Sequence, residues 1–248
     1  DIYRVLAPET LISKETRNDS NILNKEFYNE LLYIMGLEEI KKKVDGQEKK
    51  IIQRIAAGKR QYHSLLESAM RLASYSFPGT NEEELFEPCL EIVLQWINRI
   101  IFLKLLETQL VNFHNGDEKF KFLAAGKFKS FDEIADLFFG VLAVRKEQRN
   151  SNLRGDFDLI PYLNSSLFEM TDMERKYVRI GEIKDGKMIP FGKTILLDSK
   201  GKSYRTEPIG NLSYLLSFLD SYDFGSIYEK TENATENESS KQLISSSV

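Results

Sequence analysis

The sequence predicts a mainly α protein, a multi-helix bundle around a long and buried central helix with a small β-hairpin insertion. Apolar residues recur at helical spacing from residue 85 to residue 110, and shorter amphipathic stretches with capping residues flank this run. Beyond about residue 173 the spacing changes, because short apolar runs there alternate with turn sequences. With 248 residues, 42% of them hydrophobic, the chain is long enough to bury a sizeable core.

The central helix is expected over residues 80–113. A Phe-Pro-Gly turn precedes Thr80 and Glu83, which have the spacing of a capping box. Past Pro88 the apolar residues cover more than one face, which is typical of a helix buried on several sides. Pro88 itself either kinks this helix or marks the first turn of a second one. The Asn-Gly pair that follows is expected to end it.

Four shorter helices are predicted beside the central one, from capping residues and from apolar residues three or four positions apart. They are expected after Asn24 with an end at Gly36, over residues 64–75, from a capping box of Ser130 and Glu133, and after Asn211. The polar stretch 145–154, behind the third of them, is expected to be mobile.

Short strands are predicted at 177–180, 188–189 and 194–197, with hairpin turns at 185–186 and 199–201. The expected division of the chain is therefore a helical domain over 1–172, a small β insertion over 173–206, a C-terminal helix with the segment behind it over 207–229, and a polar linker over 230–248.

Positive charge is concentrated in one stretch. The chain carries a net charge of −4, yet residues 41–60 hold eight Lys and Arg against Asp45 and Glu48, a local charge of +6. Such a stripe on an acidic chain indicates a contact with phosphates. The alternative is a solvated, flexible loop around a short helix, given Gly46 and Gly58. The candidate phosphate contacts are Lys41, Lys42, Lys43, Lys49, Lys50, Arg54, Lys59 and Arg60.

Several kinds of chemistry are excluded by residue usage. One cysteine, Cys89, and two histidines, His63 and His114, do not provide a disulfide framework or a zinc site. No glycine-rich nucleotide loop, H-E-x-x-H, F-x-G-x-G or N-P-P-Y sequence occurs, so no cofactor is expected in this chain. Without a signal peptide or an uncharged run of membrane-spanning length, a cytoplasmic protein with no membrane contact is expected.

One pattern resembles the metal site of nucleases, which need an Asp and a Glu-x-Lys triplet on adjacent strands. Glu182 and Lys184 form such a triplet in the predicted β region, with Asp158 and Asp172 upstream. Four Glu-x-Lys triplets occur in this Glu- and Lys-rich chain, so the pattern has little specificity. A solvated hairpin turn is therefore preferred to a catalytic role.

Arg99 lies in the apolar part of the central helix, next to Trp96 and the core residue Cys89. A guanidinium in such a place needs a buried partner, because an unpaired one costs several kcal/mol. Arg99 is accordingly predicted to be buried and paired with a carboxylate or with carbonyl oxygens.

Four segments together resemble one family. They are NKEFYNELLYIMGL at 24–37, WINRIIFLKLL at 96–106, IPYLNSSLFE at 160–169 and SYDFGSIYE at 221–229. In order and spacing they resemble the region of type IIG restriction–modification enzymes that follows the nuclease. Ser165-Ser166 stands where those enzymes more often have Gly-Gly.

The resemblance implies a bifunctional parent protein of bacterial defence: a Mg²⁺-dependent endonuclease, a helical connector, an adenine-specific DNA methyltransferase using S-adenosylmethionine, and a region recognising double-stranded DNA. This chain would be the non-catalytic connector, ending just before the methyltransferase core, with both neighbouring domains as its partners. The alternatives are a helical protein-interaction module without a DNA role, and a minimal Mg²⁺-dependent nuclease. The motif residues carried over are Trp96, Asn98, Arg99, Pro161, Tyr162 and Asn164.

Overall fold

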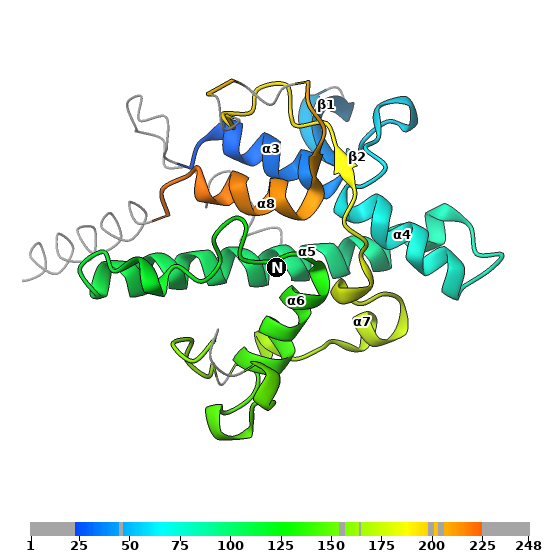
Figure 1. Cartoon of the computed structure of the whole chain (residues 1–248). Coiled ribbons are helices and arrows are strands. Elements are labelled where there is room, and N and C mark those ends of the chain that lie inside the picture. Colours follow the sequence, from blue (N-terminus) through cyan, green and yellow to red (C-terminus); the bar gives the residue numbers. More distant parts are fainter. Residues whose placement is uncertain are drawn as a thin grey trace, which may run out of the picture.

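The structure, a computed structural model, describes residues 23–44, 47–153, 157–163, 165–197, 201–202 and 206–224. Helix α5 (Glu82–Phe113) runs through the middle of the molecule (Figure 1). Helices α3 (Lys25–Met35) and α8 (Asn211–Asp220) lie along one side of it, and α6 (Phe131–Ala135) lies on the other. The predicted fold class, mainly α around a long central helix, is confirmed.

Helix α3 forms as predicted. The side chain of Asn24 accepts a hydrogen bond from the Phe27 N–H (3.0 Å), which satisfies one of the free N–H groups at the helix start. Gly36 ends the helix in the left-handed region, with φ of 97°. A Cβ atom at this position would lie 2.7 Å from the Ser64 hydroxyl oxygen. Both the backbone and the space therefore require glycine.

Helix α4 (Leu65–Ser76) leads into α5, whose cap differs from the expected one. Asn81 is the cap and accepts from the Glu84 N–H (2.8 Å), one residue after the predicted Thr80 and Glu83 pair. Pro88 lies inside the uninterrupted helix. At 1.5 Å per residue α5 is about 48 Å long. The core residues Cys89 and Trp96 are fully buried on it, as expected.

The element after Ser130 is shorter than predicted. Ser130 caps α6, accepting from the Glu133 N–H at 3.4 Å, but the Glu133 carboxylate accepts from Lys129 instead of completing a capping box. From Asp136 to Leu142 the backbone is π-helical. Short 3₁₀ turns occupy Ala57–Lys59, Glu118–Phe120, Lys146–Gln148, Ser151–Leu153, Ser166–Phe168 and Ile180–Glu182.

Helix α8 is held against α3 by buried polar contacts. The Tyr214 hydroxyl donates to Glu30 (2.7 Å) on α3 and accepts from the Phe191 N–H (2.8 Å). Asn211, expected as a cap, is the first residue of the helix. Its side chain accepts from the Gly186 N–H (3.2 Å) and donates to the His63 carbonyl (3.0 Å). Asn211 therefore joins three segments that are distant in the sequence.

Most of the basic stretch lies in a β-hairpin, so the short helix in the alternative interpretation of this stretch is wrong. Strands β1 (Leu37–Val44) and β2 (Gln47–Arg54) pair antiparallel, with Lys41 opposite Lys50 and Lys42 opposite Lys49. The lysine run concealed the strands from pattern reasoning, because β-branched residues are few in them: Ile40 and Val44 in β1, and Ile51 and Ile52 in β2.

The second sheet is smaller than predicted. Strand β3 (Lys187–Met188) pairs with β4 (Ile209–Gly210), which lies beyond the expected boundary at residue 206. The predicted strand at 177–180 is wrong: helix α7 (Asp172–Lys176) and a 3₁₀ turn flank and overlap it. A capping box of Thr171 and Glu174 starts α7, which explains why helix forms there.

Gly186 should be intolerant of a side chain. A Cβ atom there would lie 2.1 Å from Nδ1 of the His63 ring, which packs over this glycine. We expect Gly186→Ala to lower the free energy of unfolding by about 1–3 kcal/mol, because the half-buried His63 ring has to shift. Denaturant unfolding measures this effect. The control is Gly192→Ala, where no atom lies within 4 Å of the added Cβ; equal effects of the two substitutions would contradict the prediction.

Candidate functional site

The two faces of the β1–β2 hairpin differ in charge. Side chains alternate between faces, and directly opposite residues share a face. One face carries acids as well as lysines and forms diagonal ion pairs, Lys50 with Glu39 (3.0 Å) and Lys41 with Glu48 (3.5 Å). Two of the six lysines predicted to contact phosphate are therefore already paired with carboxylates.

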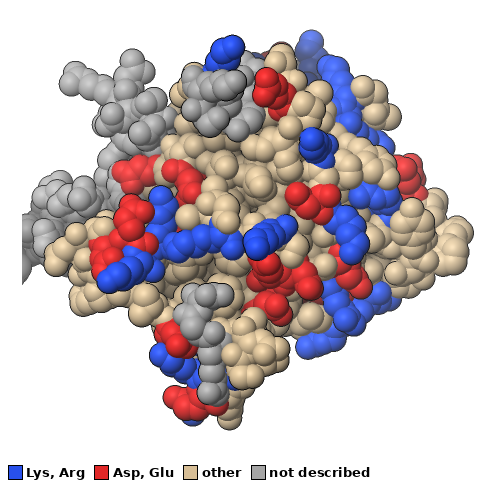
Figure 2. Space-filling model, in the orientation of Figure 1, with Lys and Arg blue, Asp and Glu red and all other residues tan. Residues whose placement is uncertain are grey.

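The other face carries Lys42 and Lys49 directly opposite each other. Both are exposed, and neither forms an ion pair with any of the residues that the structure describes. Two like charges in this arrangement repel each other, so the pair is less stable alone than with an anion between its members. Blue side chains gather in Figure 2 along the upper right edge, over the region of β1 in Figure 1.

The two arginines of the basic stretch face inward. Arg54 donates two hydrogen bonds to Glu67 and one to Glu82, each of 2.7 Å. Arg60 donates to the carbonyl of Ile55 (2.9 Å) and also reaches Glu82 (3.4 Å). Both arginines thus fasten the foot of the hairpin to α4 and α5. Of the eight predicted cations, those exposed without a described ion pair are Lys42, Lys43, Lys49 and Lys59.

Arg99 is fully buried and paired, which confirms the prediction. Its guanidinium donates to both oxygens of Glu174 (2.6 and 2.9 Å) and to the carbonyls of Leu167 (2.6 Å) and Glu169 (2.7 Å). The Trp96 indole N–H donates to the same carboxylate (2.8 Å). This cluster joins two of the segments that carry the family resemblance, since α5 holds the donors Trp96 and Arg99, and residues 167–174 hold the acceptors.

Burial alone would raise the pKa of the Glu174 carboxyl. Hydrogen bonds from Arg99, from the Thr171 N–H and from Trp96 outweigh burial and hold the pKa below its ordinary value. Glu174 is therefore a carboxylate at neutral pH, and the buried charges balance each other.

The remaining motif residues lie apart from this cluster. Asn98 is half-buried, Pro161 is exposed, and the Tyr162 ring lies 6.0 Å from the Arg145 guanidinium. Asn164 lies outside the described residues. Of the motif residues that the structure describes, Trp96 and Arg99 are therefore the two that are fully buried.

The polar stretch 145–154, expected to be mobile, holds one buried arginine within its described residues, 145–153. Arg149 is 3% exposed and donates to the carbonyls of Val144 (3.3 Å), Phe157 (3.1 Å) and Ile160 (2.9 Å). Burial lowers its pKa from the usual value, although the guanidinium stays charged. One buried arginine thus connects three carbonyl groups of this region by hydrogen bonds.

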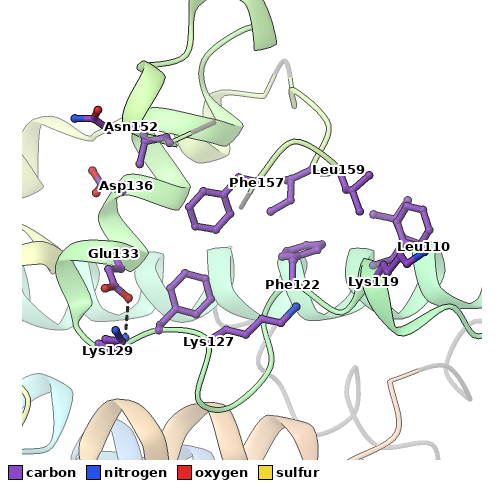
Figure 3. A pocket seen from close by; sticks show the side chains of 14 residues that line it. Leu110, Lys119, Phe122, Lys127, Lys129, Glu133, Asp136, Asn152, Phe157 and Leu159 are labelled. Carbon is purple, nitrogen blue, oxygen red and sulfur yellow. Dashed lines mark hydrogen bonds between the residues drawn. The ribbon is translucent and has the colours of Figure 1, made fainter. Parts of the chain in front are cut away.

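The loop closes a pocket of about 540 Å³ beside the C-terminal part of α5 (Figure 3). Aromatic rings form its middle, Lys119 and Lys127 lie toward one end, and an amide and two carboxylates lie at the other end together with Lys129. Its lining residues are Leu110, Lys119, Phe120, Phe122, Lys127, Phe128, Lys129, Glu133, Asp136, Asn152, Leu153, Phe157, Leu159 and Ile160.

Sequence reasoning missed this pocket, although a signal was present. Phe120 and Phe122 alternate with lysines over residues 119–122, and Phe128 lies between Lys127 and Lys129. Interleaved basic and aromatic residues are typical of surfaces that contact nucleotides. Their significance depends on residues 151–153 and 157–160, whose position no local pattern predicts.

The nuclease-like triplet does not form a strand site. Glu182 lies in a 3₁₀ turn, and its carboxylate accepts from the Arg179 N–H (2.8 Å). Asp172 pairs with Arg175 at the start of α7 (3.0 Å). Among the described residues, no group of three or more His, Cys, Asp or Glu is placed to hold a metal ion. The arrangement at Glu182 therefore differs from the adjacent-strand geometry that the hypothesis required.

These features together define a mainly α domain with a buried ionic cluster, a projecting basic hairpin and a polar-ended aromatic pocket. The chain belongs to the family described as domain of unknown function DUF7814, which matches residues 20–244. No curated protein and no solved structure matches the chain. None of the helices in the described ranges is both long and apolar enough to cross a membrane.

Proposed function

We propose that the chain is a non-catalytic connector of a restriction–modification enzyme and touches duplex DNA through the β1–β2 hairpin. The nuclease and the adenine-specific methyltransferase would be neighbouring domains, with Mg²⁺ and S-adenosylmethionine bound by them. A cytoplasmic location belongs to the same proposal. The basis is the resemblance of four sequence segments, together with the shape and charge of the domain.

The length and continuity of α5 support a spacing role. The helix is about 48 Å long and remains unbroken through Pro88. The Arg99 cluster fastens the 167–174 segment to its middle, and α3 and α8 pack along it. A domain built in this way can hold what lies at its two ends at a fixed separation.

The Lys42–Lys49 pair is the observation that carries the DNA contact. The pair is exposed, and a backbone phosphate bound between the two ammonium groups would relieve their repulsion. Aromatic residues are missing from 41–60, so contact through this hairpin would be insensitive to base sequence. With two or three phosphates neutralised, log K should fall with log salt at a slope of about −2 to −3.

A matched pair of double variants tests the contact. Lys42→Gln/Lys49→Gln and Lys41→Gln/Lys50→Gln each remove two opposite lysines from the same hairpin, so both change the net charge equally. We expect the first variant to flatten the salt slope by about 2 and the second to flatten it by less than 1. The measurement is fluorescence anisotropy of labelled duplexes of two unrelated sequences at several salt concentrations.

Three outcomes are distinguishable in that experiment. A selective loss in the Lys42/Lys49 variant, equal for both sequences, supports the proposal. Equal losses in the two variants would assign the contact to the whole hairpin rather than to one face. Unchanged affinity and slope in both variants would reject the DNA contact and favour a protein-interaction module.

A further inference from the structure

We propose that the pocket beside α5 binds a nucleotide, with an amino-bearing base among the phenylalanine rings and the phosphate at the lysine end. This inference does not depend on the hairpin. The pocket lies on one side of α5, and helices α3 and α8 lie on the other (Figures 1 and 3). Its volume of about 540 Å³ is within the range of small-molecule sites.

The rings supply the surface for a flat base. Phe122 and Phe128 are only 6% and 5% exposed, so they form a fixed floor. Phe157 lies nearly parallel to Phe128, with an interplanar angle of 18° and 6.2 Å between ring centroids. An aromatic ligand stacking on such a platform gains about 1–3 kcal/mol per base in proteins that bind single strands.

The lysine end supplies charge for a phosphate. Lys127 extends along the pocket beneath Phe122 in Figure 3, and its ammonium donates to the carbonyl of Lys121, which fixes its position. Lys119 lies at the same end, next to Leu110. It forms no ion pair with any described residue, so it is available to an anion.

The opposite end supplies acceptors for an amine. Glu133 is oriented by the Lys129 N–H (2.7 Å), and Asp136 lies one helical turn further on. Partial burial, with the neighbouring carboxylates of Asp132 and Glu133, raises the pKa of Asp136 above its ordinary value. A ligand amine donating to these carboxylates relieves their repulsion, and the Asn152 amide lies beside them.

This chemistry fits either a free mononucleotide or a nucleotide of a single DNA strand. The alternation of lysine and phenylalanine over 119–122 and 127–129 matches both sources. The two are separated by comparing adenosine monophosphate with a short oligodeoxyadenylate. Binding of the monophosphate alone indicates a free ligand, and competition between the two indicates a strand.

Titration calorimetry of the 248-residue chain tests the proposal with four probes. Adenosine monophosphate should bind at least about tenfold more tightly than inosine monophosphate, which replaces the amine by a carbonyl, because one hydrogen bond to a charged group is lost. Adenosine lacks the phosphate and ribose 5-phosphate lacks the base, and both should bind more weakly still. Hydrogen exchange should slow over 118–130 when the monophosphate binds.

Two variants and a control locate the ends of the ligand. Lys119→Gln/Lys127→Gln should remove the preference for the monophosphate over adenosine, whereas Lys187→Gln/Lys193→Gln, on exposed residues outside the pocket, should leave it intact. Asp136→Asn should reduce the preference for adenine over hypoxanthine. Absence of binding at millimolar monophosphate, or preferences that none of these substitutions changes, would overturn the proposal. Both measurements are ratios of the affinities for two ligands of the same variant. A general loss of stability would weaken both affinities and leave the ratio unchanged.

Discussion

Arg99→Ala is expected to lower the free energy of unfolding by about 3–5 kcal/mol, the range for removing one partner of a buried ion pair. The substitution leaves the Glu174 carboxylate and the carbonyls of Leu167 and Glu169 without their main donor, in a fully buried site. Denaturant unfolding followed by circular dichroism measures the loss.

The adjacent pair on α7 provides the control. Arg175 and Asp172 form an exposed ion pair three residues apart, so Arg175→Ala should cost less than about 1 kcal/mol. Arg99→Met combined with Glu174→Met should lose less than the sum of the two single variants, because no charge then remains unpaired. Additive losses in that cycle would show that the two side chains stabilise the fold independently.

The same cluster predicts a direction of pH dependence. The pKa of Glu174 is lower in the folded protein than its ordinary value near 4.5. Its contribution to stability is therefore complete above pH 4.5 and is lost as the pH falls through the folded-state pKa. In the Glu174→Gln variant, the free energy of unfolding should therefore fall less with decreasing pH than it does in the unmodified protein.

Lys104→Met is the second substitution with a large expected effect, a loss of about 3–5 kcal/mol. The Lys104 ammonium is 2.5 Å from both Glu107 on α5 and Asp220 on α8. The two acids in turn accept from the Leu123 and Ala125 N–H groups, so the cluster joins α5, α8 and the 121–130 loop. Lys104 and Glu107 are almost fully buried and Asp220 is half-buried, so Glu107 above all would lose its counter-charge out of contact with water.

Neutralising the acids should rescue this variant. Glu107→Gln and Asp220→Asn, added to Lys104→Met, remove the unpaired charges while keeping acceptors for the two N–H groups. Melting temperature and denaturant unfolding should both recover in part, whereas Lys187→Met on an exposed strand should change neither. A triple variant no more stable than Lys104→Met would show that the lysine stabilises the fold by packing rather than by charge.

The helices were predictable because their signals are local. Asn24 and Gly36 sit at the ends of α3, and the wide apolar surface around Trp96 identifies the buried centre of α5. The burial of Arg99 was also predictable, since a cation in an apolar helix needs a partner. Its partner was not, because Glu174 is 75 positions away and only tertiary packing brings it close.

The basic hairpin and the pocket were harder to predict for different reasons. In β1 and β2 the lysines stand where a half-buried strand would carry apolar residues, and diagonal ion pairs support the pairing instead. The pocket depends on Arg149 drawing three carbonyls together, a contact with no local periodicity. The positions of the lysines in the sequence therefore predicted where positive charge is concentrated. They did not predict which lysines form ion pairs with carboxylates.

The π-helical segment Asp136–Leu142 bears on how the chain length of related domains can vary. A π turn holds one residue more than an α turn, because each N–H reaches back five residues instead of four. Loss of one residue here can return the segment to an ordinary helix while the neighbouring elements keep their orientation. The same loss in α5 would rotate everything beyond it by about 100°. One-residue deletions between family members are therefore expected to occur most often at 136–142. Such a deletion would change the hydrogen-bond pattern from π-helical to α-helical without removing the helix.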